Sequence, residues 1–211
     1  MKLFVAVISG RDWKVDFGGS MIDLSSYLTQ KVLTGELENL YMLCNTTSML
    51  SLGRESMTKD AIAWGATHIL WIDDDTKFSR QAVDALLSRD VDFVAANFCR
   101  KKFPISFTAM DFDNKEVDST HKSGIEEVKK IGMGMALAKV SVLQEIGVPR
   151  YSIEWSPEYQ CYQGEDVYLC KKLHAHGFKT YVDHDASKFV AHIGDFGYSI
   201  GQVGYEAKEA A

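Results

Sequence analysis

The sequence lacks a long hydrophobic run. Its apolar stretches are far shorter than the roughly 20 residues that a membrane-spanning helix needs. The opening MKLFVAVISG combines a lysine with apolar residues, but no small-residue cleavage site follows it. We therefore interpret it as a first strand rather than a signal peptide, and expect a cytoplasmic protein that does not enter a membrane.

Cysteine is scarce and unpaired. None of the four cysteines belongs to a Cys-x-x-Cys pair, and three lie in or beside apolar segments. This pattern argues against a zinc site and predicts reduced, buried thiols. The four are Cys44, Cys99, Cys161 and Cys170.

Basic residues are fewer than acidic ones, 23 against 29, and linker-like segments are absent from the sequence. The formal net charge of −6 argues against a general nucleic-acid-binding protein; the one tight basic cluster, FCRKKFP (98–104), is a solvated loop or a local phosphate contact. No stretch rich in proline, glycine or serine marks a boundary, and no repeat is evident. We expect one domain over residues 1–211, with halves of about 1–105 and 106–193 and a glycine-rich tail, 194–211.

What the first half does contain is a series of apolar, β-branched runs. Each is nearly continuous rather than alternating, which is typical of strands buried on both faces of a parallel sheet. Helical patterns lie between them at 53–66 and at 79–90, where Ser79 is in the N-cap position. The alternation predicts a three-layer α/β/α fold with a central, mostly parallel sheet. The runs are 3–8, 40–44, 68–72 and 92–98.

The second half has a different pattern. Residues 106–132 resemble hairpin strands joined by polar turns, and residues 135–149 predict a short helix that stops at Gly147. A third helix is expected over 164–177. Strands are expected at 178–183 and 188–194.

Three consecutive carboxylates follow the most apolar strand, in the stretch HILWIDDDTKF. In an open α/β sheet, ligands bind beyond the carboxyl ends of the strands. Because residues i and i+2 of an extended segment point the same way, Asp73 and Asp75 can face one site while Asp74 turns aside. Two carboxylates leave coordination positions open on Mg²⁺ or Mn²⁺, and phosphate oxygens commonly fill them. The pattern predicts a divalent metal that joins the protein to a phosphorylated ligand.

Two further Asp-x-Asp triplets weaken the signal of this motif alone. DFD (111–113) lies in a polar region and is interpreted as a solvated loop. DHD (183–185) follows a short strand and is harder to dismiss. Position favours Asp73–Asp75, because its strand is central in the α/β half.

Three other patterns point to a site, although each also has an ordinary structural explanation. Glu165 and Asp166 begin a helix, where the macrodipole favours anions and where acidic residues often only cap. His192 follows an apolar strand, in a position to ligate a metal or to serve a structural role. Gly132 and Gly134 let a backbone approach a ligand closely, or simply form turns.

Taken in order, these segments resemble the GT-A glycosyltransferases, particularly small family-2-like enzymes. The resemblance covers most of the chain, and its stand-alone size is similar to that of short glycosyltransferases carried by tailed bacteriophages, which would act in the host cytoplasm. The segments that carry it are FVAVISGR, GRESMTKDAIAWGATHILWIDDDT, IGMGMALAK, GEDVYLCKKLHAHGFKTYV and AHIG.

The resemblance implies a GT-A fold, a UDP- or GDP-sugar donor and a role for each matched residue. Asp73, Asp75 and His192 would hold Mn²⁺ or Mg²⁺ on the donor diphosphate. Asp166 would be the general base of an inverting transfer, and Glu165 or Asp166 would orient sugar or acceptor in a retaining one. Contacts to the nucleotide are implied for Ser9, Arg11, Arg54, Asp73 and Asp74.

Some features depart from the family or leave alternatives open. Many relatives carry Asn after the helix arginine, where this chain has Glu55. A phosphatase of the haloacid-dehalogenase type would want Thr or Val at the position of Lys77, and a nucleotidyltransferase would want a basic, glycine-rich first loop. A non-catalytic sugar- or nucleotide-binding module, or a degenerate transferase, is the alternative to an enzyme. The acceptor is open between hydroxymethylated DNA, a glycan and a protein.

Overall fold

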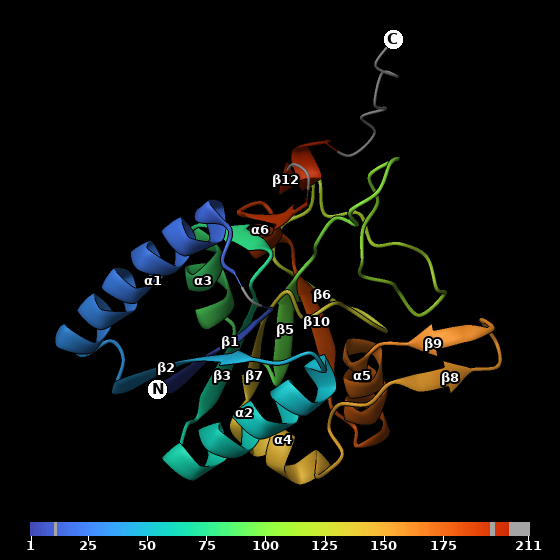
Figure 1. Ribbon diagram of the computed structural model, residues 1–211. Coiled ribbons are helices and arrows are strands. Elements are labelled where there is room, and N and C mark those ends of the chain that lie inside the picture. Colours follow the sequence, from blue (N-terminus) through green and yellow to red (C-terminus); the bar gives the residue numbers. More distant parts are fainter. Residues whose placement is uncertain (11, 195–196, 203–211) are drawn as a thin grey trace.

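The computed structural model describes residues 1–10, 12–194 and 197–202 (Figure 1). Its centre is a seven-stranded sheet. The strands are β1 (Lys2–Ser9), β2 (Asn39–Thr46), β3 (His68–Asp73), β5 (Phe93–Ala96), β6 (Ile125–Glu127), β7 (Met135–Lys139) and β10 (Thr180–Asp183). Their order across the sheet is β2-β1-β3-β7-β5-β10-β6. Strands β2, β1, β3, β5 and β10 run in one direction, while β7 and β6 run against them.

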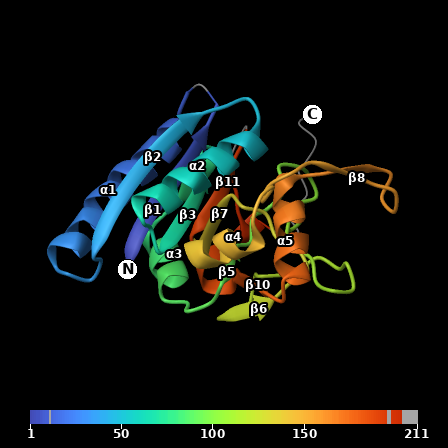
Figure 2. The same cartoon turned by 90° about the horizontal axis from the view of Figure 1, so that it is seen from below.

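Helices cover both faces of this sheet (Figures 1 and 2). One layer packs α2 (Leu50–Trp64), α4 (Val140–Ile146) and α5 (Glu165–Ala175) on one hydrophobic cluster. The other packs α1 (Val15–Leu33), α3 (Arg80–Leu87) and α6 (His184–Ser187) on a second cluster. The protein is therefore the three-layer α/β/α fold with a mostly parallel sheet that the sequence predicts. Among the described residues, no helix combines the length and apolarity that crossing a bilayer demands.

Two smaller sheets flank the main one. β4 (Thr76–Phe78), β11 (Val190–Ile193) and β12 (Gly197–Tyr198) form a three-stranded sheet, and the 3₁₀ helix η1 (Ile200–Gln202) follows it. β8 (Glu154–Ser156) and β9 (Cys161–Gln163) form a hairpin that projects beside α5 (Figure 1).

The continuous apolar pattern of β1 follows from its place inside the sheet. It pairs with β2 on one side and β3 on the other, and helices cover both its faces. Leu3, Val5 and Val7 contact the layer of α1 and α3, while Phe4, Ala6 and Ile8 contact the layer of α2. Burial of both sets selects Val, Ile, Leu and Phe at successive positions.

Strand β2 corrects one expectation. The sequence predicts that residues 40–44 are buried on both faces, but β2 is an edge strand whose residues alternate between exposed and half-buried. Tyr41 is 44% exposed. An edge strand has a neighbour on one side only, so apolar residues alone do not guarantee burial. The thiol prediction is corrected in the same way: all four cysteines are free, but only Cys99 and Cys170 are buried.

The 19-residue helix α1 is absent from the sequence-based interpretation. Gly18 and Gly19 lower the helical propensity of its first turns, which hides the pattern. The helix is nevertheless stable in context because one stripe is buried against the sheet. That stripe is Phe17, Met21, Leu24 and Leu28.

The second half holds the other corrections. Residues 135–139 form strand β7 rather than the start of a helix, because the segment is inserted between β3 and β5 and buried there. Residues 106–132 contain only the short strand β6 and isolated bridges, not hairpins. The helix predicted over 164–177 is confirmed as α5, with Gly177 at a φ of +82° just past its end.

Candidate active site

The polar edge of the sheet is where β1 and β3 end. Asp74 follows β3 and turns its carboxylate toward the first loop. Its Oδ2 accepts hydrogen bonds from Ser9 Oγ at 2.8 Å and from the backbone N–H of Gly10 at 2.7 Å. Asp74 therefore fixes the loop that the sequence assigns to the nucleotide. Arg11, the other loop residue assigned to the nucleotide, lies outside the described residues.

Arg54 bridges two carboxylates from distant parts of the chain. Its Nη2 donates to Asp73 Oδ1 at 2.9 Å, and its Nε donates to Glu165 Oε1 at 3.2 Å. The side chain of Arg54 is only 2% exposed, so its position corrects the expectation of a direct nucleotide contact. A buried guanidinium needs paired anions, and here they tie the end of β3 to the start of α5.

Burial also governs the protonation of Asp73. Removal from water raises the pKa of Asp73 to about 6; Arg54 opposes this, and the nearby carboxylate of Asp75 adds to it. The Asp73 side chain keeps 27% of its surface exposed. It is therefore reachable from the sheet edge, although one of its oxygens is held by Arg54.

Asp75 and His192 are brought together by the small sheet. β11 pairs with β4 so that His192 lies opposite Thr76, and the backbone N–H of Ile193 donates to Asp75 O at 2.6 Å. As a result, His192 Nε2 is 3.2 Å from Asp75 Oδ2. The other ring nitrogen, Nδ1, lies 3.0 Å from Cys99 O. A carbonyl only accepts, so Nδ1 carries a proton, and Nε2 is the ring nitrogen that faces Asp75, as a donor to its carboxylate or, once it has lost its proton, as a metal ligand.

The spacing of Asp75 and His192 fits a divalent cation. Two ligands at right angles, each about 2.1 Å from an octahedral ion, lie about 3.0 Å apart. The 3.2 Å between Asp75 Oδ2 and His192 Nε2 is close to this value. A carboxylate with an imidazole also suits Mn²⁺.

The predicted three-residue metal site is assembled only in part. Over residues 1–10, 12–194 and 197–202, no three His, Cys, Asp or Glu side chains form a group that could hold a metal ion. Asp75 and His192 meet, but Asp73 is turned to Arg54. The pair would have to rely on ligand oxygens and water for its remaining coordination positions.

Lys101 is a member of this site that the sequence analysis did not assign to it. Its Nζ is 2.5 Å from Asp75 Oδ2, the oxygen that also faces His192. Burial would raise the pKa of Asp75, but hydrogen bonds from His192 and Lys101 outweigh it and lower the pKa to about 2. The signal that could have found Lys101 is its place in the basic cluster soon after β5.

Asp166 stands next to Glu165 at the start of α5, but it has a different environment. Burial and the charge of Glu165 raise its pKa above the ordinary value. Its side chain accepts a hydrogen bond from the Val167 backbone at 2.7 Å and has no ion pair among the described residues. Asp166 is thus the acidic side chain of this helix start that is available to take a proton.

The glycines of the segment 132–134 differ in their surroundings. A Cβ at Gly132 would lie 3.7 Å from Asp166 Oδ2, so this backbone runs beside the candidate base. A Cβ at Gly134 would lie 3.0 Å from the Phe98 ring. The close packing of the Phe98 ring accounts for a glycine at this position without the approach of a ligand.

The rival acidic triplets have structural roles. Asp111 Oδ1 accepts backbone N–H bonds from residues 113 and 115, which makes DFD a turn. Asp183 caps α6 and binds Arg89 Nε at 2.8 Å. Glu55, the departure from the family pattern, binds Arg150 Nη1 at 2.5 Å and so belongs to the packing of α2 rather than to this site.

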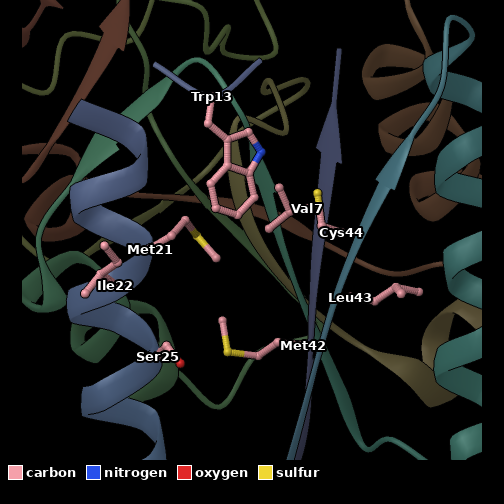
Figure 3. Close-up of a pocket in the computed structure, with 8 residues that line it drawn as sticks. All are labelled: Val7, Trp13, Met21, Ile22, Ser25, Met42, Leu43 and Cys44. Atoms are coloured by element: carbon pink, nitrogen blue, oxygen red, sulfur yellow. The ribbon is translucent and has the colours of Figure 1, made fainter. Parts of the chain in front are cut away.

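A separate apolar cavity lies between α1 and β2 (Figure 3). Its volume is about 320 Å³. Ser25 is the one residue with a hydroxyl among those that line it, and no carboxylate does, so the cavity lacks the oxygen ligands that Mg²⁺ or Mn²⁺ prefers. The lining residues are Val7, Trp13, Met21, Ile22, Ser25, Met42, Leu43 and Cys44.

Comparison with solved structures defines the class of fold. The mixed α/β architecture with a large, mostly parallel sheet is the GT-A glycosyltransferase fold. One similar structure is A197 from STIV, with a TM-score of 0.61 and 17% identity over 96% of this chain and 92% of that one. Another is a mutant Drosophila β1,4-galactosyltransferase 7 in complex with manganese, UDP-Gal and xylobiose, with a TM-score of 0.55 and 10% identity over 92% of this chain and 71% of that one. No protein-family model matches the sequence, and a search of curated proteins finds no relative.

Proposed function

We propose that this protein is a metal-dependent glycosyltransferase that moves a sugar from a nucleotide-sugar donor to a hydroxyl group. The observation that carries the proposal is the meeting of Asp75 and His192 at 3.2 Å, at the edge of the sheet where β1 and β3 end. The galactosyltransferase of the same fold was crystallised with manganese and UDP-Gal, which supports a similar donor here.

The residues divide the work by position. Asp75 and His192 would hold Mn²⁺ or Mg²⁺, which supplies charge stabilisation on the leaving diphosphate. The loop fixed by Asp74 would receive the UDP or GDP part of the donor. Ser9 and Arg11 are the residues of this loop that the family resemblance assigns to the nucleotide. Arg54 acts as a positioning residue, because it holds Asp73 and Glu165 in place without reaching the surface.

Asp166 would act as the general base. It takes the proton of the acceptor hydroxyl while that oxygen bonds to the anomeric carbon and the bond to the diphosphate breaks. A raised pKa suits this role, since it brings the carboxylate closer to the pH at which it must accept a proton. Glu165 is engaged with Arg54, which favours Asp166 over Glu165 for proton transfer.

Hydrolysis of nucleotide sugars without an acceptor tests this proposal. A panel of UDP- and GDP-sugars is incubated with the protein and Mn²⁺, and release of free sugar is measured. We expect slow hydrolysis that EDTA abolishes and that Asp75→Ala lowers about 100-fold. Asp113→Ala is the matched control, because it removes an exposed aspartate of the rival triplet.

Two results would contradict the proposal. Donor binding without any hydrolysis would favour a non-catalytic nucleotide-sugar-binding module. Hydrolysis that is unchanged in Asp75→Ala would remove Asp75 from the metal site.

A further inference from the structure

Three lysines gather around a small cavity beside the start of α5. Its volume is about 70 Å³, and Lys129, Lys130 and Lys171 line it. At about 30 Å³ for each water in the liquid, it holds about two waters, which suits one compact polar group rather than a whole sugar ring. The hairpin of β8 and β9 contributes Ser156 and Gln163 to its wall.

The lysines of this cavity face neutral partners. Lys129 Nζ donates to Asn114 Oδ1 at 2.9 Å, and Lys171 Nζ donates to Gln163 Oε1 at 2.5 Å. Lys130 Nζ lies 4.9 Å from the centre of the Tyr159 ring. In the described part of the chain, none of the three forms an ion pair with a carboxylate.

The cavity carries an excess of positive charge. Its one acidic residue, Glu158, acts on Lys130 and on Tyr159, and one carboxylate does not match three lysines. Burial, together with the charges of Lys129 and Arg100, lowers the pKa of Lys130. In a chain with a formal net charge of −6, such a concentration of unpaired cations attracts an anion.

The cavity is adjacent to the candidate base. Lys130 is two residues before Gly132, whose Cβ position lies 3.7 Å from Asp166 Oδ2. On the other wall, Val167 directly follows Asp166 and lines the cavity. The segments 129–132 and 163–167 thus contribute both to the surroundings of Asp166 and to the lysine cavity.

We infer that the acceptor carries a terminal phosphate group, which Lys129, Lys130 and Lys171 bind while Asp166 faces the accepting hydroxyl. The role of the phosphate-bearing molecule as an acceptor rests on the proposed glycosyltransferase function, whereas the anion site itself does not. A single phosphate fits the small volume, and ammonium groups bind it as point charges. The neutral amides of Asn114 and Gln163 hold two of the lysines in place when no anion is bound.

Binding of inorganic phosphate tests the site without donor or metal. The protein is labelled with ¹³C at lysine Cε and titrated with phosphate in EDTA, at constant ionic strength set with chloride. We expect saturable shifts of the lysine signals of the cavity, and binding at least about tenfold weaker in Lys130→Met. Lys171→Met, an exposed position, provides a second variant whose folding is not at risk. Lys179→Met, which removes an exposed lysine paired with Glu127, is the control and should bind phosphate as the wild type does.

Absence of saturable binding would overturn the inference. Phosphate binding by Lys130→Met and Lys171→Met that is as tight as that of the wild type would overturn it too. Glucose 6-phosphate and a short single-stranded oligonucleotide separate a terminal phosphate from a phosphodiester. Displacement of phosphate by the sugar phosphate supports the inference, whereas displacement by the oligonucleotide alone contradicts it.

The outcome is distinguishable from failure of the proposed function. Phosphate binding is measured without nucleotide sugar, and donor hydrolysis is measured without acceptor. Hydrolysis without phosphate binding would leave the transferase and remove the phosphorylated acceptor. Phosphate binding without hydrolysis would leave an anion site on a protein that is not a transferase.

Discussion

His192 Nε2 lies 3.2 Å from Asp75 Oδ2, although the two residues are 117 positions apart in the sequence. The pairing of β11 with β4 produces this contact, and Cys99 O orients the ring from its other side. A ligand pair that is oriented in this way before the ion arrives loses little conformational freedom on binding.

Metal affinity should depend on both residues of this pair. We expect Asp75→Ala and His192→Ala each to weaken Mn²⁺ binding at least about tenfold, since each removes one ligand. Titration followed by electron paramagnetic resonance of free Mn²⁺ measures this. Asp113→Ala should bind Mn²⁺ like the wild type; equal affinity in all three variants would place the metal elsewhere.

Lys101 should compete with the metal ion. Its ammonium group lies 2.5 Å from Asp75 Oδ2, where a divalent cation would repel it. We therefore expect Lys101→Met to bind Mn²⁺ several-fold more tightly than the wild type in the absence of nucleotide. The same titration checks this, and weaker binding in Lys101→Met would show that the lysine supports the site instead.

Arg54 should be important for stability. Arg54→Leu leaves Asp73 and Glu165 without their cation in a largely buried setting, which costs about 3–5 kcal/mol in the free energy of unfolding. Urea denaturation measures the difference. Lys77→Met, which breaks an exposed pair with Asp16, should change stability by no more than about 0.5 kcal/mol. Similar values for both variants would mean that the bridge does not hold β3 to α5.

The rate of sugar transfer should follow the protonation of Asp166. The base must be ionised, and burial raises its pKa above the ordinary 3.8, so the acid limb of the rate profile should lie above that value. The rate then rises with pH until Asp166 has lost its proton. Asp166→Asn should abolish transfer while leaving Mn²⁺ affinity intact; an acid limb that persists in Asp166→Asn would assign it to another group.

His184 should make stability dependent on pH. It lies 2.9 Å from Ser119 Oγ through Nδ1 and 3.1 Å from Glu126 Oε2 through Nε2, in an arrangement that resembles a hydrolase triad. Ser119 is completely buried, however, so the group is structural rather than catalytic. Burial lowers the pKa of His184 below its ordinary 6.5, so the unfolded chain binds a proton more readily than the folded protein.

The contribution of His184 is therefore complete above about pH 6.5 and is lost as the pH falls through its lower folded value. We expect His184→Gln to lose less stability than the wild type between pH 8 and pH 5 in urea denaturation. His121→Gln, at an exposed position, should keep the wild-type dependence. Identical pH dependence in all three proteins would contradict this assignment.

The sequence by itself determined the layers of the fold and the candidates for the site. Continuous apolar runs identify β1, β3 and β5 because these strands are covered on both faces, and burial on both faces selects an apolar residue at nearly every position. The acidic residues after β3 and at the start of α5 stand out in the sequence because neighbouring carboxylates repel one another, so a cluster of them indicates a partner cation or another specific role. Strand alternation did not predict the directions of these side chains, because β3 ends at Asp73 and a turn places Asp74 and Asp75.

Only the tertiary structure decided which partner each of these groups has. Residues 135–139 favour a helix by local propensity, and they become β7 because two neighbouring strands enclose them. The burial of Arg54 between Asp73 and Glu165, and the approach of Lys101 to Asp75, join residues from separate elements. Such contacts depend on how strands are ordered across the sheet, and no local pattern of residues encodes that order.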